Sequence, residues 1–351
     1  MSVAVHPERI VVKIGTSSLV SDGRVVPDKA AALVEEIADL LRSGLRPVLV
    51  ASGAIALGRA AGAEQRQLAA AVGQGPFFEA LRTRLAHYGL TAAQFLLTPL
   101  DLIDVRHRHS VQDALEHAFE QGVIPVVNEN DAVHVRNNDI LAALISVLLR
   151  ARSLVLLTDV PGLYDSDPRT DPDARLIPEI KSMTVEVERL AGATDATGEG
   201  LGTGGMVSKL GAVWIATTAG VTAAILGARQ PGVLSRLMRG ETVGTVVHPR
   251  AGTVDDDLER LWRVFADPPA GTVVCRPDTR RTVAAGESVL RDAVLRTAGR
   301  FAEGDVIDLA LPGGEVIARG RTRCHHSLPA AAPGGQTVVH PSEYVSFLED
   351  S

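Results

Sequence analysis

The chain has 351 residues, of which 46% are hydrophobic and 22% are charged, and its formal net charge at pH 7 is −7. This length favours two domains and this composition is typical of a globular protein, whereas the negative charge argues against broad electrostatic binding to nucleic acid or to an anionic membrane. No apolar run approaches the roughly 18 residues of a membrane span, and the N-terminus carries no signal-peptide pattern, so we expect a cytoplasmic protein without a membrane anchor.

Residues 1–250 alternate short β-branched runs with amphipathic helical patterns, which is typical of a mainly parallel sheet covered by helices. The clearest helix begins at Pro27 and ends at Gly44, with its apolar residues on one face. We therefore predict an α/β domain over residues 1–250. Its expected strands are Ile10–Ile14, Pro47–Ala51, Ala93–Leu97, Ile124–Asn128, Leu154–Thr158 and Thr222–Leu226.

Polar or glycine-bearing turns follow four of these strands, at Lys13–Ser18, Ser52–Ala54, Asn128–Asp131 and Thr158–Gly162. Ligands of open α/β sheets bind at the carboxyl ends of the strands. We therefore expect these four turns to converge on one site.

A glycine-rich stretch lies further along the chain, where five glycines between Gly198 and Gly205 precede Lys209. We predict a helix from Met206 to a stop at Gly220, so that backbone N–H groups and the helix N-terminus would together favour a phosphate group. Two known motifs are excluded. No strand precedes the apparent G-x-G-x-x-G pattern, as a dinucleotide fingerprint requires, and the Gly-Lys-Ser/Thr of a P-loop is absent. A flexible surface loop remains the alternative.

The regular alternation ends near Pro249. We predict a linker over residues 251–271 and a second, small and mostly β domain over residues 272–351, with short strands at Thr272–Val274, Val306–Leu311 and Thr337–Val339. Cys275 and Cys324 lack the spacing of a disulfide framework or a zinc site, and we expect incidental thiols.

Taken in order, five motifs resemble the glutamate 5-kinase family. They begin at Val12, Ala51, Asn128, Leu157 and Gly202, and read VKIGTS, ASGAIA, NENDAV, LTDVPGLY and GTGGM. The resemblance implies the amino acid kinase fold, a three-layer sandwich around a mainly parallel sheet, and a PUA-like C-terminal domain. It also implies phosphorylation of the γ-carboxylate of L-glutamate by MgATP, the first step of proline biosynthesis.

A carboxylate is already a nucleophile at neutral pH, so this chemistry needs positioning and charge neutralisation rather than a general base. We expect Lys13 and Lys209 to neutralise the transferring phosphoryl group, with Asp139 orienting them. The resemblance assigns ATP binding to Lys13, Gly15, Thr158, Asp159, Thr203, Gly204, Gly205, Met206, Val207, Ser208 and Lys209. It assigns glutamate binding to Ser52, Gly53, Asn128, Asp131, Asn137 and Asn138. We expect magnesium to come with the nucleotide, and no protein metal cage.

Simpler structural roles remain open for some of these residues. Asn138 and Asp139 could cap a helix, and Asp159 could form the turn before Pro161.

Three features depart from the family pattern. The segment between Asp131 and Asn138 is short, Asn137 stands where the family usually has aspartate, and the end of the second domain after Arg323 is shortened. Loss of a carboxylate at position 137 would remove one partner for a substrate ammonium group, and so could alter specificity or proline feedback.

The resemblance also implies a homodimer or homotetramer, feedback inhibition by proline, and a glutamyl phosphate reductase as the next enzyme. RNA binding by the second domain is not expected, because its arginines are balanced by acids and it has few aromatic residues. Two other functions stay open: a related kinase that forms an acyl phosphate on a different carboxylate, and a catalytically idle amino-acid sensor or RNA-binding module.

Overall fold

A computed structural model describes residues 6–133, 137–168, 170–192, 205–251, 254–327 and 335–348. The chain divides into two compact units, residues 1–250 and residues 251–351, and each has its own hydrophobic core. Every helix within the described ranges is too short or too polar to cross a bilayer.

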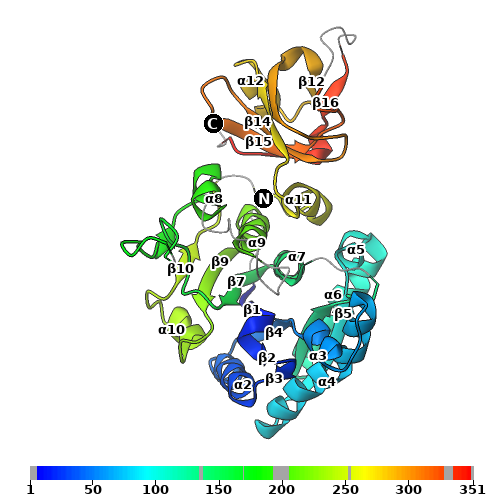
Figure 1. Ribbon diagram of the computed structural model, residues 1–351, viewed down its shortest axis with the longest axis vertical. Coiled ribbons are helices and arrows are strands. Elements are labelled where there is room, and N and C mark those ends of the chain that lie inside the picture. The colour runs from blue at the N-terminus through cyan, green and yellow to red at the C-terminus, as the bar shows by residue number, and fades with distance from the viewer. Residues whose placement is uncertain are drawn as a thin grey trace. The chain divides into compact units, whose positions relative to one another are not determined.

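An eight-stranded sheet forms the centre of the first unit (Figure 1), in the order β5-β6-β4-β1-β7-β9-β10-β8. The strands from β5 to β9 in this order are parallel, and β10 runs antiparallel to β9. A two-stranded hairpin of Val20–Ser21 (β2) and Arg24–Val25 (β3) lies outside the sheet. The sheet strands are His6–Ile14 (β1), Arg46–Ala51 (β4), Thr91–Leu97 (β5), Val123–Glu129 (β6), Ala151–Thr158 (β7), Glu179–Ile180 (β8), Thr222–Gly227 (β9) and Thr245–Val247 (β10).

Helices connect the strands of this unit. They are Thr16–Leu19 (α1), Pro27–Arg42 (α2), Ala54–Ala60 (α3), Arg66–His87 (α4), Pro99–Ile103 (α5), Val105–Glu120 (α6), Asn138–Leu148 (α7), Val185–Gly192 (α8), Met206–Thr218 (α9) and Val233–Met238 (α10). The six strands and two helices predicted from the sequence of this unit are all confirmed, each within a few residues of the expected bounds.

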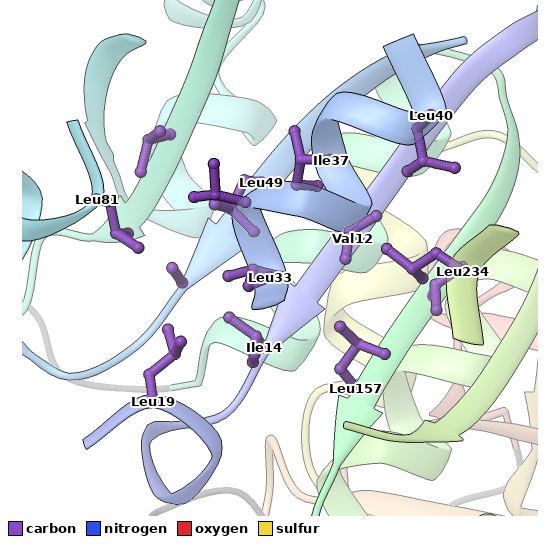
Figure 2. Close-up of a cluster of buried hydrophobic side chains, with 14 of the residues drawn as sticks. Val12, Ile14, Leu19, Leu33, Ile37, Leu40, Leu49, Leu81, Leu157 and Leu234 are labelled. Carbon is purple, nitrogen blue, oxygen red and sulfur yellow. The ribbon is translucent and has the colours of Figure 1, made fainter. Parts of the chain in front are cut away.

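The alternation of side chains along β1 separates the two faces of the sheet. Ile10, Val12 and Ile14 belong to the core that includes α2, and Figure 2 shows Val12 and Ile14 gathered with Leu33 and Ile37 of that helix. Successive side chains of a strand point to opposite faces. Lys13 therefore points to the other face, where α7 packs against β1 and β7, and α9 packs against α7.

The second unit is mostly β. Its main sheet has the order β13-β11-β14-β15-β17, and β12 pairs with β16. Its strands are Gly271–Cys275 (β11), Val289–Leu290 (β12), Val294–Gly299 (β13), Val306–Ala310 (β14), Val316–Arg321 (β15), Thr337–Val339 (β16) and Tyr344–Ser346 (β17). Its α-helices are Leu258–Phe265 (α11) and Thr279–Ala284 (α12), with single 3₁₀ turns at Arg291–Ala293 and Pro341–Glu343.

The segment predicted as a linker, residues 251–271, contains helix α11 instead. Leu258, Leu261, Val264 and Phe265 are buried, and α11 packs against β15 and β17 of the second unit. This helix was not predicted because its eight residues are few and the Pro268-Pro269 pair that follows them is typical of a linker. Cys275 and Cys324 are both free and buried. Burial raises the pKa of Cys275 to about 12 and also raises that of Cys324, so neither thiol is ionised at neutral pH.

Candidate active site

Lys13 and Lys209 converge on the carboxylate of Asp139. Lys13 is the penultimate residue of β1, and its Nζ lies 2.6 Å from Asp139 Oδ1. Lys209 lies in the first turn of α9, and its Nζ is 3.6 Å from Asp139 Oδ2. Asp139 itself is fully buried in the first turn of α7. Lys13 lies 126 positions before Asp139 in the chain and Lys209 lies 70 positions after it. We call these three residues the lysine–aspartate cluster.

Charge in this cluster is unbalanced. Burial lowers the pKa of Lys13, an effect that Asp139 opposes and Lys209 reinforces. Burial alone would raise the pKa of Asp139, but Lys13, Lys209 and a hydrogen bond from Ser208 together hold that pKa below its ordinary value. Asp139 therefore stays ionised at neutral pH. Two lysines facing one carboxylate leave positive charge for an incoming anion.

The N-terminus of α9 adjoins the cluster. Ser208 Oγ donates to Asp139 Oδ2 at 2.8 Å and also lies 2.9 Å from the Gly205 carbonyl oxygen. Gly205 precedes the helix in an extended conformation, Met206 is half-buried and Val207 is exposed. The helix predicted to begin at Met206 is therefore present, while Thr203, Gly204 and the rest of the glycine-rich stretch lie outside the described residues.

Gly15 follows β1 directly beside Lys13. A Cβ added at Gly15 would lie 3.8 Å from Lys13 Nζ and would meet no other atom within 4 Å. Protein packing therefore does not explain the glycine at this position. A side chain here would occupy the space next to the lysine amine, where an anion would bind.

Thr158 ends β7, the strand next to β1 in the sheet, and Asp159 follows it directly. Thr158 Oγ1 donates to Asp159 Oδ1 at 3.1 Å, and the Thr158 carbonyl oxygen accepts from the N–H of Ala228.

A second group of polar side chains lies beside the first. Asn138 Nδ2 donates to Ser52 Oγ and to Asn128 Oδ1, both at 2.9 Å, and Asn138 Oδ1 accepts from the backbone N–H of Glu129. Asn128 Nδ2 in turn donates to Gln74 Oε1 at 2.7 Å. We call these four side chains, Gln74, Asn128, Asn138 and Ser52, the amide network. Since Asn138 and Asp139 are adjacent in α7, the amide network and the lysine–aspartate cluster are neighbours.

The start of α7 also settles which residue caps it. Asn137 accepts the N–H of Asp139 with its side chain and is the N-cap, a role for which asparagine and aspartate are equally suited. The alternative in which Asn138 and Asp139 serve only as caps is therefore wrong, because their side chains are engaged elsewhere. Capping of α7 also gives a structural role to Asn137, at the position where the family pattern has aspartate.

Asp131 and Gly53 each lie two residues beyond the end of a strand, β6 and β4 respectively. Asp131 is half-buried, and burial raises its pKa to about 6 although the positive charge of Arg66 opposes this shift. Gly53 has a packing reason to be glycine: an added Cβ would lie 2.6 Å from the ring of Phe77 and 2.9 Å from Val20 Cγ2.

The sequence analysis missed Gln74 and Arg66, both on α4. Neither residue belongs to a recognisable motif. Which residues of α4 lie near β6 depends on the close contact between α4 and α3, and this contact is not visible in the sequence. Among the described residues no group of three or more histidine, cysteine, aspartate or glutamate side chains is suited to hold a metal ion.

Residues 8–227 match the model of the amino acid kinase family. Glutamate 5-kinase of Geobacter sp. (strain M21) is 38% identical over 330 residues, which cover 90% of this chain and 87% of that protein. Glutamate 5-kinase of Chromohalobacter salexigens is 38% identical over 356 residues, which cover 97% and 92% of the two chains. In structure, UMP kinase from Bacillus anthracis is similar at a TM-score of 0.50 and 16% identity, covering 70% of this chain and 98% of that one, a likeness of fold alone.

Proposed function

Because this chain belongs to the amino acid kinase family, and within it to the glutamate 5-kinases, we propose that the lysine–aspartate cluster and the amide network are the two halves of its active site. The enzyme transfers the γ-phosphoryl group of ATP to the γ-carboxylate of L-glutamate, which gives L-glutamyl 5-phosphate for proline biosynthesis. The fold is that of the amino acid kinases, as the sequence motifs predicted.

The observation that carries the assignment of the site is the adjacency of Asn138 and Asp139. One residue belongs to a group of hydrogen-bonding amides suited to an amino acid, and the next holds two lysines suited to phosphate. Phosphoryl transfer to a carboxylate brings two anions together in line, so the protein must position both and neutralise their repulsion. Two half-sites on consecutive residues meet that requirement.

In this proposal Lys13 and Lys209 contact the phosphate groups and offset the charge that spreads over the transferring phosphoryl oxygens. Asp139 does not touch the substrate, because both of its oxygens face the lysines and Ser208. It is a positioning residue that fixes the separation of the two amines. Gly15 leaves room for the phosphate beside Lys13.

We propose MgATP as the phosphoryl donor. Mg²⁺ in such sites keeps several waters and takes phosphate oxygens as ligands, so it needs few protein carboxylates. Asp159, at the end of β7, is the acidic residue we assign to its surroundings, and Thr158 with Gly205–Lys209 to the nucleotide. On the amino-acid side, Asp131 and Asn137 supply acceptors for the ammonium group, and Ser52, Gly53, Asn128 and Asn138 line the carboxylate.

Hydroxylamine trapping tests the proposal directly. An acyl phosphate reacts with hydroxylamine to give a hydroxamate, which is detected as its coloured iron complex. The purified chain with MgATP and L-glutamate should yield glutamyl hydroxamate, whereas N-acetylglutamate and aspartate, supplied in parallel, should yield little. Product with a different acid and none with glutamate would overturn the glutamate assignment. Absence of product with every acid would favour the idle sensor.

We further propose, from the family alone, that proline inhibits the enzyme, that it works in the cytoplasm as a homodimer or homotetramer, and that a glutamyl phosphate reductase consumes its product. An acyl phosphate hydrolyses in water, so the product must be passed promptly to the enzyme that consumes it, the role that this proposal gives to the reductase.

A further inference from the structure

Gln74 lies in α4, outside every motif that the function accounts for. Its only contact among the hydrogen bonds of the described residues is with Asn128, whose Nδ2 donates to Gln74 Oε1 at 2.7 Å. Asn128 and Asn138 are buried at 3% and 8% exposure, whereas Gln74 and Ser52 are half-buried. A molecule entering the amide network therefore reaches Gln74 and Ser52 first.

The direction of every hydrogen bond in this network follows from one backbone group. The N–H of Glu129 can only donate, so the atom of Asn138 that faces it is the oxygen. The Asn138 nitrogen then faces Ser52 and Asn128, which places the Asn128 oxygen toward Asn138 and the Asn128 nitrogen toward Gln74. Gln74 must accept with Oε1, and its amino group is turned away from Asn128.

This polarity leaves several donor hydrogens of the network without an acceptor among the residues that the structure describes. The Ser52 hydroxyl accepts from Asn138 and retains its own hydrogen, Asn128 retains one amide hydrogen, and Gln74 retains both of its amide hydrogens. No bond within the described residues uses these hydrogens. An ionised carboxylate accepts hydrogen bonds and donates none, so it is the group that such a site recognises.

Two glycines bring α4 close enough for this contact. A Cβ on Gly73, the neighbour of Gln74, would lie 1.8 Å from the carbonyl oxygen of Ala54, and a Cβ on Gly58 would lie 1.9 Å from that of Ala69. Helices α3 and α4 therefore meet backbone to backbone. Since α3 begins directly after Ser52 and Gly53, this close packing sets Gln74 beside the same strand ends as Ser52.

We propose that Gln74 is a specificity-determining residue of the glutamate site. Its Oε1 holds Asn128 in the donor orientation, and its amide hydrogens, with those of Ser52 and Asn128, bind a carboxylate of the amino acid in preference to a neutral amide. This inference rests on the proposed function, because it requires an amino-acid carboxylate as the ligand.

The test compares Gln74→Met and Gln74→Glu with the unaltered full-length chain. Methionine keeps the length of the side chain and removes both the acceptor and the donors. Glutamate keeps an acceptor for Asn128 but replaces the donors with negative charge. In both variants we expect KM for L-glutamate to rise about tenfold or more, with the larger rise in Gln74→Glu, while kcat and KM for ATP change by less than about twofold.

Two amides of the substrate separate recognition from mere packing. L-glutamine carries its amide at the γ-position and L-isoglutamine at the α-position. The preference for glutamate over each amide is measured as the ratio of the inhibition constant of the amide to KM of glutamate. We expect this ratio, for one of the two amides, to be at least fivefold lower in Gln74→Met than in the wild type. The amide whose ratio falls identifies the carboxylate that Gln74 faces.

Gln67→Met is the matched control, since Gln67 is an exposed glutamine on the same helix. It should leave both ratios and KM unchanged. Unchanged KM in the Gln74 variants, or a raised KM with both ratios unaltered, would overturn the inference. Thermal unfolding verifies that the variants fold, and Gln74→Glu provides a nearly isosteric variant if Gln74→Met does not. If the unaltered chain forms no glutamyl hydroxamate, the proposed function fails; if it does and the ratios do not move, only the role of Gln74 fails.

Discussion

Asp139 is surrounded by the groups on which the proposed phosphate site depends. Its two oxygens face Lys13, Lys209 and Ser208, and it is fully buried. An ion pair in such a place contributes little net stability, because the cost of desolvating the charges offsets their attraction. Its value is geometric: the carboxylate keeps two cations close to each other that would otherwise repel.

Replacing Asp139 with asparagine should reduce kcat about a hundredfold or more, because the two lysine amines lose the charge that holds them. KM for L-glutamate should change much less, since the amide network is untouched. Hydroxamate formation over a range of substrate concentrations measures both constants. Asp113→Asn, an exposed aspartate on α6, serves as the control and should be neutral. Equal loss in kcat and in glutamate affinity would contradict a role confined to the phosphate side.

Asp131 gives the site a pH dependence. Its pKa of about 6 means that the carboxylate becomes ionised as pH rises through 6. An ammonium group is bound by the ionised form, so KM for L-glutamate should be about tenfold higher at pH 5 than at pH 7.5. In Asp131→Asn the profile should be flat across this range, with KM high throughout. A steep profile that survives this substitution would assign the titration to another group.

The raised pKa of Asp131 also makes stability depend on pH, but stability is favoured by the protonated form, whereas glutamate binding is favoured by the ionised form. Because the pKa of Asp131 is higher in the folded chain than its ordinary value of 3.8, protonated Asp131 favours folding, and this contribution is fully present below pH 3.8 and lost as pH rises through 6. The site therefore gives up some stability at neutral pH in order to present a charged carboxylate.

At the scale of helices and strands, the sequence was most informative where local pattern and function coincide. The β-branched run at Ile10–Ile14 predicted β1, and the glycines after α2 and α9 marked the ends of those helices. The short strands β8 and β10 escaped prediction, because two or three residues carry no periodicity and their pairing is decided by distant parts of the chain.

Gln74 could not be predicted for a related reason. Nothing in the sequence of α4 states which of its faces meets β6, since the apolar stripe of this helix is weak and is interrupted by Gly73, Gly75 and Pro76. The deciding contacts are those between the backbones of α3 and α4, which join residues whose proximity no local pattern encodes.

Gly73→Ala tests the role of that contact. The added methyl group would lie 1.8 Å from the Ala54 carbonyl oxygen, so backbone must shift, and we expect a loss of about 1–3 kcal/mol in the free energy of unfolding together with a higher KM for glutamate. Urea unfolding and hydroxamate kinetics measure the two effects. Gly75→Ala is the control on the same helix: nothing lies within 4 Å of its added Cβ, and the variant should gain up to about 1 kcal/mol from helix propensity. If Gly73→Ala were as stable as Gly75→Ala, the close packing of α3 and α4 would not be what positions α4.

At the scale of the whole molecule, every proposed site residue that the structure describes belongs to the first unit, and the second unit is held by a core of its own. The second unit also buries an ion pair, in which Arg319 Nε donates to Asp308 Oδ1 at 2.7 Å between β14 and β15. Substitutions in the second unit are therefore expected to change its stability and to leave catalysis unchanged.

Asp308→Ala should destabilise the second unit by about 3–5 kcal/mol, because it leaves the buried charge of Arg319 without its carboxylate. Below the unfolding temperature of that unit, kcat should stay within about twofold of the unaltered chain. Differential scanning calorimetry should show one transition lowered and the other kept. Glu315→Gln breaks an exposed ion pair with Arg280 in the same unit and should cost less than about 1 kcal/mol. A parallel fall in kcat for Asp308→Ala at low temperature would mean that the units depend on each other for activity.

The first residues of α7 have one more consequence, for the size of acid that can react. Asn138 and Asp139 are successive residues of a single helix, so the rise of about 1.5 Å and the turn of about 100° per residue fix how far apart their side chains start. The interval between the amide that belongs to the amide network and the carboxylate that positions both lysines is thus set by covalent geometry, and the distance from the bound amino acid to the phosphate follows from it through the two ion pairs. A helix does not stretch to meet a shorter molecule: an acid lacking one methylene could be held at one end and would fail to reach phosphorus at the other. The start of α7 would therefore act as a gauge of carbon-chain length.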